Sequence, residues 1–233
     1  VTSSQSYPSS MMGVFALLKQ VYYDANWYSK GSSTTNDKSL EALNKNKNVI
    51  QIFEAKSKIN SLRIDKIGDE FGIQYVMLGG GDEYERIEEI KATNASYILP
   101  VNFPAAYDIE DTYSANILQL SDMREWNQRP TNLSQFEKNN IEFAITLDGL
   151  KSSNNLKENI IKAIDHGLTK GKALEALTSI PAKLIGRDDV IGYLKKDYLA
   201  NFLITSGDLF DGNTLIYENW VKGNRNVINS MEI

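Results

Sequence analysis

The spacing of hydrophobic residues changes along the chain from a helical period to short apolar runs. Over residues 11–28 the apolar positions recur at intervals of three and four, which predicts an amphipathic helix. Further on, short apolar segments alternate with longer amphipathic ones, a pattern typical of strands separated by helices. The expected strands are residues 49–53, 73–78, 97–101 and 141–147. Strand–helix–strand units of this length predict parallel neighbours in one sheet.

The remaining segments predict further helices, a long loop and a second sheet. Helices are expected at residues 59–71, 82–93 and 155–165, and another begins at Thr169, a suitable N-cap. Residues 102–135, rich in Tyr, Asp and Asn, predict a long loop of the kind that often forms a lid. Late strands are expected at residues 191–194, 199–205 and 214–221. We therefore expect two parts, residues 1–188 and residues 189–233.

Composition excludes several classes of function. The net charge of −5 argues against non-specific binding to nucleic acid, which requires a basic surface. The chain contains neither an apolar run of about 18 residues, as a membrane span needs, nor a signal-peptide pattern. It has no cysteine, so thiolate metal sites, disulfides and cysteine nucleophiles are excluded. The polar start without Met leads us to expect a piece of a longer protein.

Candidate chemistry lies just past the ends of the expected strands. In parallel α/β folds, functional residues gather at the carboxyl ends of the strands. The residues at these places are Glu54, Gly79, Gly80, Gly81, Asp82, Glu83, Asn102 and Asp148. The carboxylate of Asp148 can hold a metal ion or act as a base, although an Asp here is also common in a simple turn. The three glycines favour a turn that lets a ligand or another chain segment approach closely.

Residues 167–204 resemble the C-terminal hallmark of the amidohydrolase superfamily, of imidazolonepropionase and Xaa-Pro dipeptidase type. The resemblance is carried by Ala173, Leu174, Ala176, Leu177, Thr178, Pro181, Ala182, Leu184, Gly186, Ile191, Gly192, Leu194 and Ala200. It implies an α/β fold, a partial (β/α) TIM-barrel-like domain followed by strands of a small appended β domain. It also implies hydrolysis of C–N bonds in amides or cyclic amides of small-molecule or peptide-like substrates. We further expect Leu174, Leu177 and Leu184 to face the core.

The resemblance implies roles for some of the candidate residues and shows that the family's usual metal-binding histidines are missing at other positions. It places Asp148 where the family's last barrel strand carries an Asp that binds metal and takes a proton from water. Glu54 stands in place of one metal-binding His, as a possible ligand, and Gly79 and Gly80 stand near the place of another. The family implies a divalent, zinc-type metal, but His166 is the chain's one histidine, so tight binding by this chain alone is not expected. An enzyme module and a catalytically degenerate module that binds a ligand or supports other modules both stay open.

The first residues carry a second resemblance. Gln5, Tyr7, Pro8, Ser9, Ser10, Met12 and Gly13 resemble a segment of large exported amidohydrolase-like proteins of Bacteroidetes-type bacteria. This implies an exported or periplasmic location and further modules in the same protein. Because parallel strands end on one side, we also expect Glu54, Asp82, Glu83 and Asp148 to lie together under residues 102–135, where they would favour a cation.

Overall fold

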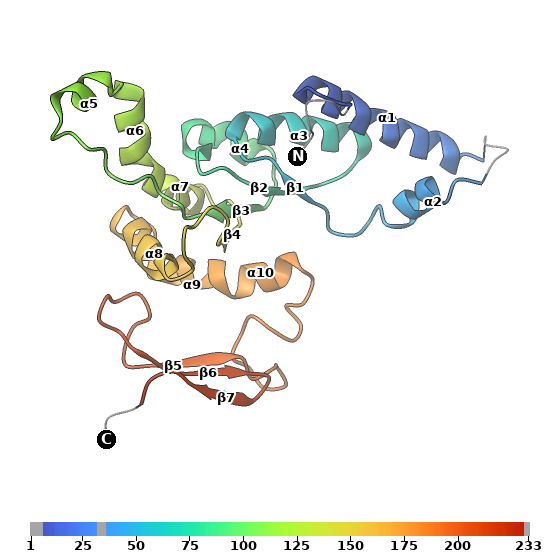
Figure 1. Ribbon diagram of the computed structural model, residues 1–233. Coiled ribbons are helices and arrows are strands. Elements are labelled where there is room, and N and C mark those ends of the chain that lie inside the picture. The colour runs from blue at the N-terminus through green and yellow to red at the C-terminus, as the bar shows by residue number, and fades with distance from the viewer. Residues whose placement is uncertain (1–6, 32–35, 231–233) are drawn as a thin grey trace.

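A four-stranded parallel sheet forms the centre of the protein (Figure 1). The computed structural model describes residues 7–31 and 36–230; Gln5 of the N-terminal resemblance lies outside this range. The strands are β1 (Ile52–Glu54), β2 (Val76–Leu78), β3 (Tyr97–Pro100) and β4 (Phe143–Thr146). They follow the order β1-β2-β3-β4, and each neighbouring pair is parallel. The predicted sheet is therefore confirmed, with strands shorter than expected.

Three of the expected helices form at nearly the expected residues. They are α1 (Met11–Ser29), α3 (Lys58–Phe71) and α8 (Asn155–Asp165), and a short further helix, α2 (Lys38–Lys45), precedes β1. The Ser10 hydroxyl accepts a hydrogen bond from the Gly13 N–H at 3.2 Å, and Gly72 ends α3 in the left-handed conformation. The segment expected as one helix at residues 82–93 is divided into a 3₁₀ turn, η1 (Glu83–Arg86), and α4 (Ile87–Ala92).

The prediction of a loop at residues 102–135 is wrong. After an irregular start, the segment forms α5 (Thr112–Ile117), α6 (Leu120–Gln128), the 3₁₀ turn η2 (Arg129–Thr131) and the first part of α7 (Asn132–Lys138). Leu133 and Phe136 are fully buried, so a few apolar anchors stabilise α7 within a polar sequence. Figure 1 shows α5 standing away from the sheet.

The core lies where α7 packs against the strands. Tyr97, Phe136 and Phe143 are fully buried, and their rings meet edge to face, with the Phe136 centroid 5.1 Å from Tyr97 and 5.8 Å from Phe143. Such tilted aromatic pairs stabilise a core beyond the area they bury. Helices α9 (Lys170–Leu177) and α10 (Ser179–Leu184) also contact β4.

The expectation that three leucines of the hallmark segment face this core is confirmed for Leu177, which packs against the core, but not for Leu174 or Leu184. Leu174 is 48% exposed, and Leu177 and Leu184 are only half-buried. Ala173 and Ala176 are fully buried instead, because small side chains let α9 approach β4 closely. Leu174 and Leu177 also line the groove between α9 and the C-terminal sheet.

This placement predicts a small effect for the hallmark leucines. We expect Leu177→Ala to lower the free energy of unfolding by about 1–2 kcal/mol, less than for a fully buried leucine, because the side chain is half-buried. Leu174→Ala should change it by less than about 0.5 kcal/mol. Urea denaturation of both variants checks this, and a loss above about 3 kcal/mol for Leu177→Ala would contradict the observed packing.

A separate antiparallel sheet ends the chain. It consists of β5 (Phe202–Thr205), β6 (Ile216–Val221) and β7 (Asn224–Val227), in that order. The strand expected at residues 191–194 does not form, because Gly192 has φ +91° and turns the chain against α10. The polar strand β7 was missed; it follows a hairpin turn at Lys222 and Gly223, both with positive φ. Since Phe210, between β5 and β6, is buried in the main core, the domain boundary at 188/189 stays a prediction.

Half-buried Asp65 on α3 predicts a pH-dependent stability. Burial, followed by the charge of Asp69, raises the pKa of Asp65 from its ordinary value of 3.8 to about 6. The folded state therefore binds this proton more tightly than the unfolded state, so stability falls as the pH rises from about 4 to about 6. Asp65→Asn should stabilise the chain at pH 7 and have little effect at pH 3.5 in urea denaturation. A variant that gains equally at both pH values would refute this assignment.

Candidate functional site at the carboxyl ends of the strands

Three charged side chains meet at the carboxyl ends of the two outer strands. Glu54 ends β1, Lys56 follows it by two residues, and Asp148 follows β4. Lys56 Nζ lies 2.6 Å from Glu54 Oε1 and 3.7 Å from Asp148 Oδ2. We call Glu54, Lys56 and Asp148 the strand-end triad. The expected meeting of Glu54 with Asp148 thus occurs around a lysine that was not among the predicted site residues, because Lys56 lies in the loop two residues past the end of β1.

The backbone fixes the position of Lys56. Its φ of +54° is left-handed, and the N–H groups of Ala55 and Lys56 both donate to the Leu78 carbonyl, at 3.0 and 3.1 Å. A Cβ atom on Gly80 would lie 2.3 Å from the Lys56 carbonyl oxygen, a severe clash. Gly80 therefore permits the close approach of another chain segment, which is one of the two functions expected of the three-glycine turn.

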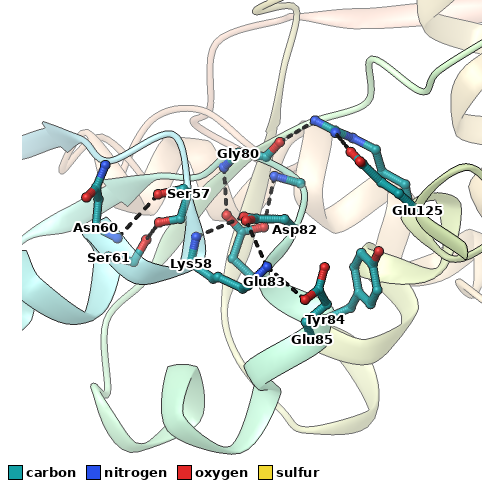
Figure 2. A network of polar contacts seen from close by, with 12 residues as sticks. Ser57, Lys58, Asn60, Ser61, Gly80, Asp82, Glu83, Tyr84, Glu85 and Glu125 are labelled. Atoms are coloured by element: carbon teal, nitrogen blue, oxygen red, sulfur yellow. Dashed lines mark hydrogen bonds and ion pairs between the residues drawn. The ribbon is translucent and has the colours of Figure 1, made fainter. Parts of the chain in front are cut away.

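The side chain of Glu83 accepts hydrogen bonds from the backbone of the glycine turn, as Figure 2 shows for Gly80. This side chain is fully buried and accepts hydrogen bonds from Gly80 N–H at 2.6 Å, Gly81 N–H at 3.0 Å and Asn132 Nδ2 at 2.9 Å. Burial raises the pKa of the Glu83 carboxyl, although these bonds oppose that shift. Gly79 must lack a side chain, since a Cβ there would lie 2.6 Å from Glu83 Oε1. The expected pocket residue Glu83 is thus a buried support of the turn.

Asp82 and Arg129 flank the same turn. Asp82 accepts a hydrogen bond from the Lys58 N–H at 2.8 Å, and its other oxygen lies 3.4 Å from Lys58 Nζ (Figure 2). Arg129, in η2, donates to the Gly80 carbonyl at 2.5 Å and pairs with Glu125 at 2.6 Å. The end of the 102–135 segment therefore contacts the glycine turn, while α5 does not cover it (Figure 1).

Asn102 lies beside the loop that follows β4. A Cβ atom on Gly149, whose φ is +75°, would lie 2.2 Å from Asn102 Nδ2, so Gly149 allows this contact. Asn102 Oδ1 is buried and has no hydrogen-bond partner among the residues that the structure describes. A buried amide oxygen without a donor is costly, so a donor from water or ligand suits this position.

Within the strand-end triad, the pKa shifts of Glu54 and Lys56 both favour the charged form of the side chain. The pKa of the Glu54 carboxyl is lowered, chiefly by its hydrogen bond with Lys56. The pKa of Lys56 is raised, first by that bond and then by the charge of Asp148. Lys56 is therefore an ammonium ion at neutral pH, held between two acidic side chains.

The residues at these strand ends do not fit a zinc-type ion. Zinc sites use imidazole or thiolate ligands with carboxylates, and His166 is the chain's one such residue. His166 ends α8, which runs back from the carboxyl end of β4, so it lies toward the opposite end of the sheet from Asp148. Its Nδ1 lies 2.7 Å from the Lys162 carbonyl oxygen. In the described ranges, no three His, Cys, Asp or Glu side chains gather closely enough to hold a metal ion.

The strand-end triad lines neither of two larger cavities in the described part of the chain. One of about 490 Å³ is next to the amino end of β4, with Glu137, Asn140 and Thr169 in its wall. A larger, mainly apolar groove of about 890 Å³ separates α9 and α10 from the C-terminal sheet, and Leu174, Leu177 and Trp220 line it. Within the part of the chain that the structure describes, no helix is long and apolar enough to cross a bilayer.

Comparison with known proteins agrees with this architecture. An amidohydrolase from Thermotoga maritima superposes with a TM-score of 0.72 at 18% identity, covering 94% of this chain and 56% of that one. A Xaa-Pro dipeptidase with bound methionine in its active site gives a TM-score of 0.55 at 14% identity, covering 81% and 47%. This chain thus spans about half the length of these structures. No curated protein matches it.

The fold and a family model identify the chain's relatives. The structural matches show a partial amidohydrolase fold. The model of the amidohydrolase family matches residues 71–231, well over half of the chain and from the end of α3 to beyond β7. The chain therefore belongs to the amidohydrolase family.

Proposed function

We propose that the chain is part of a hydrolase of C–N bonds in amides or cyclic amides, with Asp148 as its general base. Family membership supports hydrolysis in general. The observation that carries the specific proposal is the position of Asp148, 45% exposed, directly past the last strand of a parallel sheet. In folds of this kind, reactions occur at that edge of the sheet.

The chemistry assigned to Asp148 is proton transfer. Its carboxylate takes a proton from a water molecule as the water oxygen bonds to the carbonyl carbon of the substrate. The same proton then passes to the leaving nitrogen as the C–N bond breaks, which gives a carboxylic acid and an amine. Asn102, beside Gly149, can orient a water molecule through its buried Oδ1, which has no hydrogen-bond partner among the described residues.

The exposed edges of the sheet support the view that further strands complete the site. Among the described residues, β1 pairs with β2 alone and β4 with β3 alone. Ile52 and Leu147, on and beside these outer strands, are 57% and 50% exposed. Unpaired apolar edges are usually covered in native proteins. Remaining barrel strands in a longer chain would cover them and add the other side of the site.

A substrate survey tests this function. The longest natural chain that contains this sequence is incubated with N-acyl amino acids, dipeptides and cyclic amides, and released amine is measured. We expect turnover of at least one of these classes and little turnover of matched esters of simple alcohols. Turnover of esters alone would contradict the assignment to C–N bonds, and complete inactivity would favour the second candidate.

The second candidate is a catalytically degenerate module that binds a ligand or supports other modules. The observation that favours it is the strand-end triad, because Lys56 lies within an ion-pair distance of both Glu54 and Asp148. The same small amides would then bind without turnover. Equilibrium dialysis with radiolabelled substrate distinguishes the two candidates, since bound but unchanged amide indicates the degenerate module.

A further inference from the structure

In a metal site, a bound ion supplies the positive charge between the acidic ligands. In the strand-end triad, a side chain of the protein supplies it. Two acidic side chains, Glu54 and Asp148, approach each other from opposite edges of the sheet. Carboxylates brought together in this way repel each other unless a cation lies between them. In this chain the cation is part of the protein, since Lys56 Nζ lies 2.6 Å from one carboxylate and 3.7 Å from the other.

The local backbone is built to place that ammonium group. Lys56 has φ +54°, a conformation that few residues other than Gly, Asn and Asp adopt readily. Its N–H donates to the Leu78 carbonyl, and its own carbonyl passes close to Gly80, where any side chain would clash. The buried carboxylate of Glu83 fixes the Gly80 turn in its place. The position of Lys56 therefore depends on a rigid support that extends from β1 to η1.

We propose that the Lys56 ammonium takes the place of the divalent metal at these strand ends, as a resident counter-ion of Glu54 and Asp148. An ammonium group matches the charge requirement of the pair and excludes a second cation from the same space. The family's metal does not fit the remaining donors, which are two carboxylates and a glycine turn. This inference concerns the site of the proposed function but not its turnover, so a binding measurement can fail while the hydrolysis assay succeeds, and the reverse.

Removal of the ammonium group should open the site to a metal ion. Carboxylate ligands suit Mn²⁺, whose free concentration is measured by electron paramagnetic resonance. We expect the Lys56→Met variant of this 233-residue chain to bind one Mn²⁺ at least about tenfold more tightly than the unmodified chain. Lys56→Asn should behave alike, and Asn tolerates the left-handed backbone, so it keeps the test valid if the Met variant fails to fold. Lys56→Arg, which retains the charge, should show no gain.

Two controls separate this effect from a general change in charge. Lys183→Met removes one positive charge beside a single acid, Glu142, at the other end of the sheet, and should leave Mn²⁺ affinity unchanged. Adding Asp148→Asn to Lys56→Met should abolish the gain. The proposal is overturned if the unmodified chain binds Mn²⁺ as tightly as Lys56→Met, if Lys183→Met gains equally, or if the gain survives Asp148→Asn.

Discussion

Replacing Glu83 by alanine should lower the free energy of unfolding by about 3–5 kcal/mol. The substitution removes the fully buried acceptor of three donors, which are the N–H groups of half-buried Gly80 and buried Gly81 and the buried Asn132 amide. Each buried donor that loses its partner costs about 1–3 kcal/mol. We expect the loss of stability to be smaller than the summed costs of the three donors. Burial of the Glu83 carboxylate is itself unfavourable, as its raised pKa indicates, and the alanine variant avoids that cost.

Glu85 provides the matched control for this measurement. It lies in the same 3₁₀ turn, but its side chain is 48% exposed and pairs with Lys58 at 2.8 Å. Exposed ion pairs contribute about 0–1 kcal/mol, so Glu85→Ala should have a small effect. Equal losses for the two variants in urea denaturation, or a loss below about 1 kcal/mol for Glu83→Ala, would contradict the supporting role of Glu83.

Gly80→Ala should destabilise the chain by about 1–3 kcal/mol or more. The added Cβ atom would lie 2.3 Å from the carbonyl oxygen and 2.6 Å from the carbonyl carbon of Lys56. Those atoms belong to the backbone two residues past the end of β1, so relief of the clash requires movement of the backbone rather than of a flexible side chain. The same movement should displace Lys56 from Asp148.

Gly171 in α9 serves as the comparison for Gly80. It has an ordinary helical backbone, and a Cβ atom there would meet nothing within 4 Å. Gly171→Ala should therefore stabilise the chain by about 0.5–1 kcal/mol, since alanine favours a helix. Thermal denaturation should give a lower melting temperature for Gly80→Ala and a higher one for Gly171→Ala. An unchanged melting temperature for Gly80→Ala would contradict the requirement for glycine in this turn.

The parallel sheet could be predicted because its signal is local. Short apolar runs such as residues 97–101 and 141–147 appear as such in the sequence, and Gly72 marks the end of α3. The end of the 102–135 segment was misjudged because α7 depends on the burial of Leu133 and Phe136 rather than on a continuous apolar face. For the same reason the orientation of Leu174 was wrong, since the fit of Ala173 against β4 decides which side of α9 is buried.

The position of the candidate site could be predicted from the sequence, but the role of Lys56 and the hydrogen bonds of Glu83 could not. The rule that parallel strands end on one side correctly brought Glu54 and Asp148 together. The same rule did not predict that Lys56 lies between the two acids. The position of Lys56 depends on its left-handed backbone and on the space beside Gly80. The rule also treated Glu83 as a pocket residue, although a side chain that follows three glycines can turn inward and bind their N–H groups. Hydrogen-bond partners of this kind cannot be deduced from sequence spacing.

The family's metal chemistry and this chain's residues are in disagreement at the strand ends. Amidohydrolase-family membership suggests a divalent ion, while Lys56 supplies a fixed positive charge between the acids. A hydrolase can still use Asp148 as its base beside such a charge, because the Asp148 side chain is 45% exposed and open to a water molecule. The assignment of Asp148 therefore does not depend on whether other strands bring metal ligands.

The most direct test of the account is the rate of amide hydrolysis after Asp148→Asn. The variant is made in the longest natural chain containing this sequence, and kcat/KM is measured with an amide that the unmodified protein hydrolyses. We predict a fall of about 10²–10⁴-fold, the contribution typical of a general base. Asp165→Asn, at the far end of α8, should leave the rate unchanged. An Asp148→Asn variant that hydrolyses the amide at the unmodified rate would contradict the proposed function.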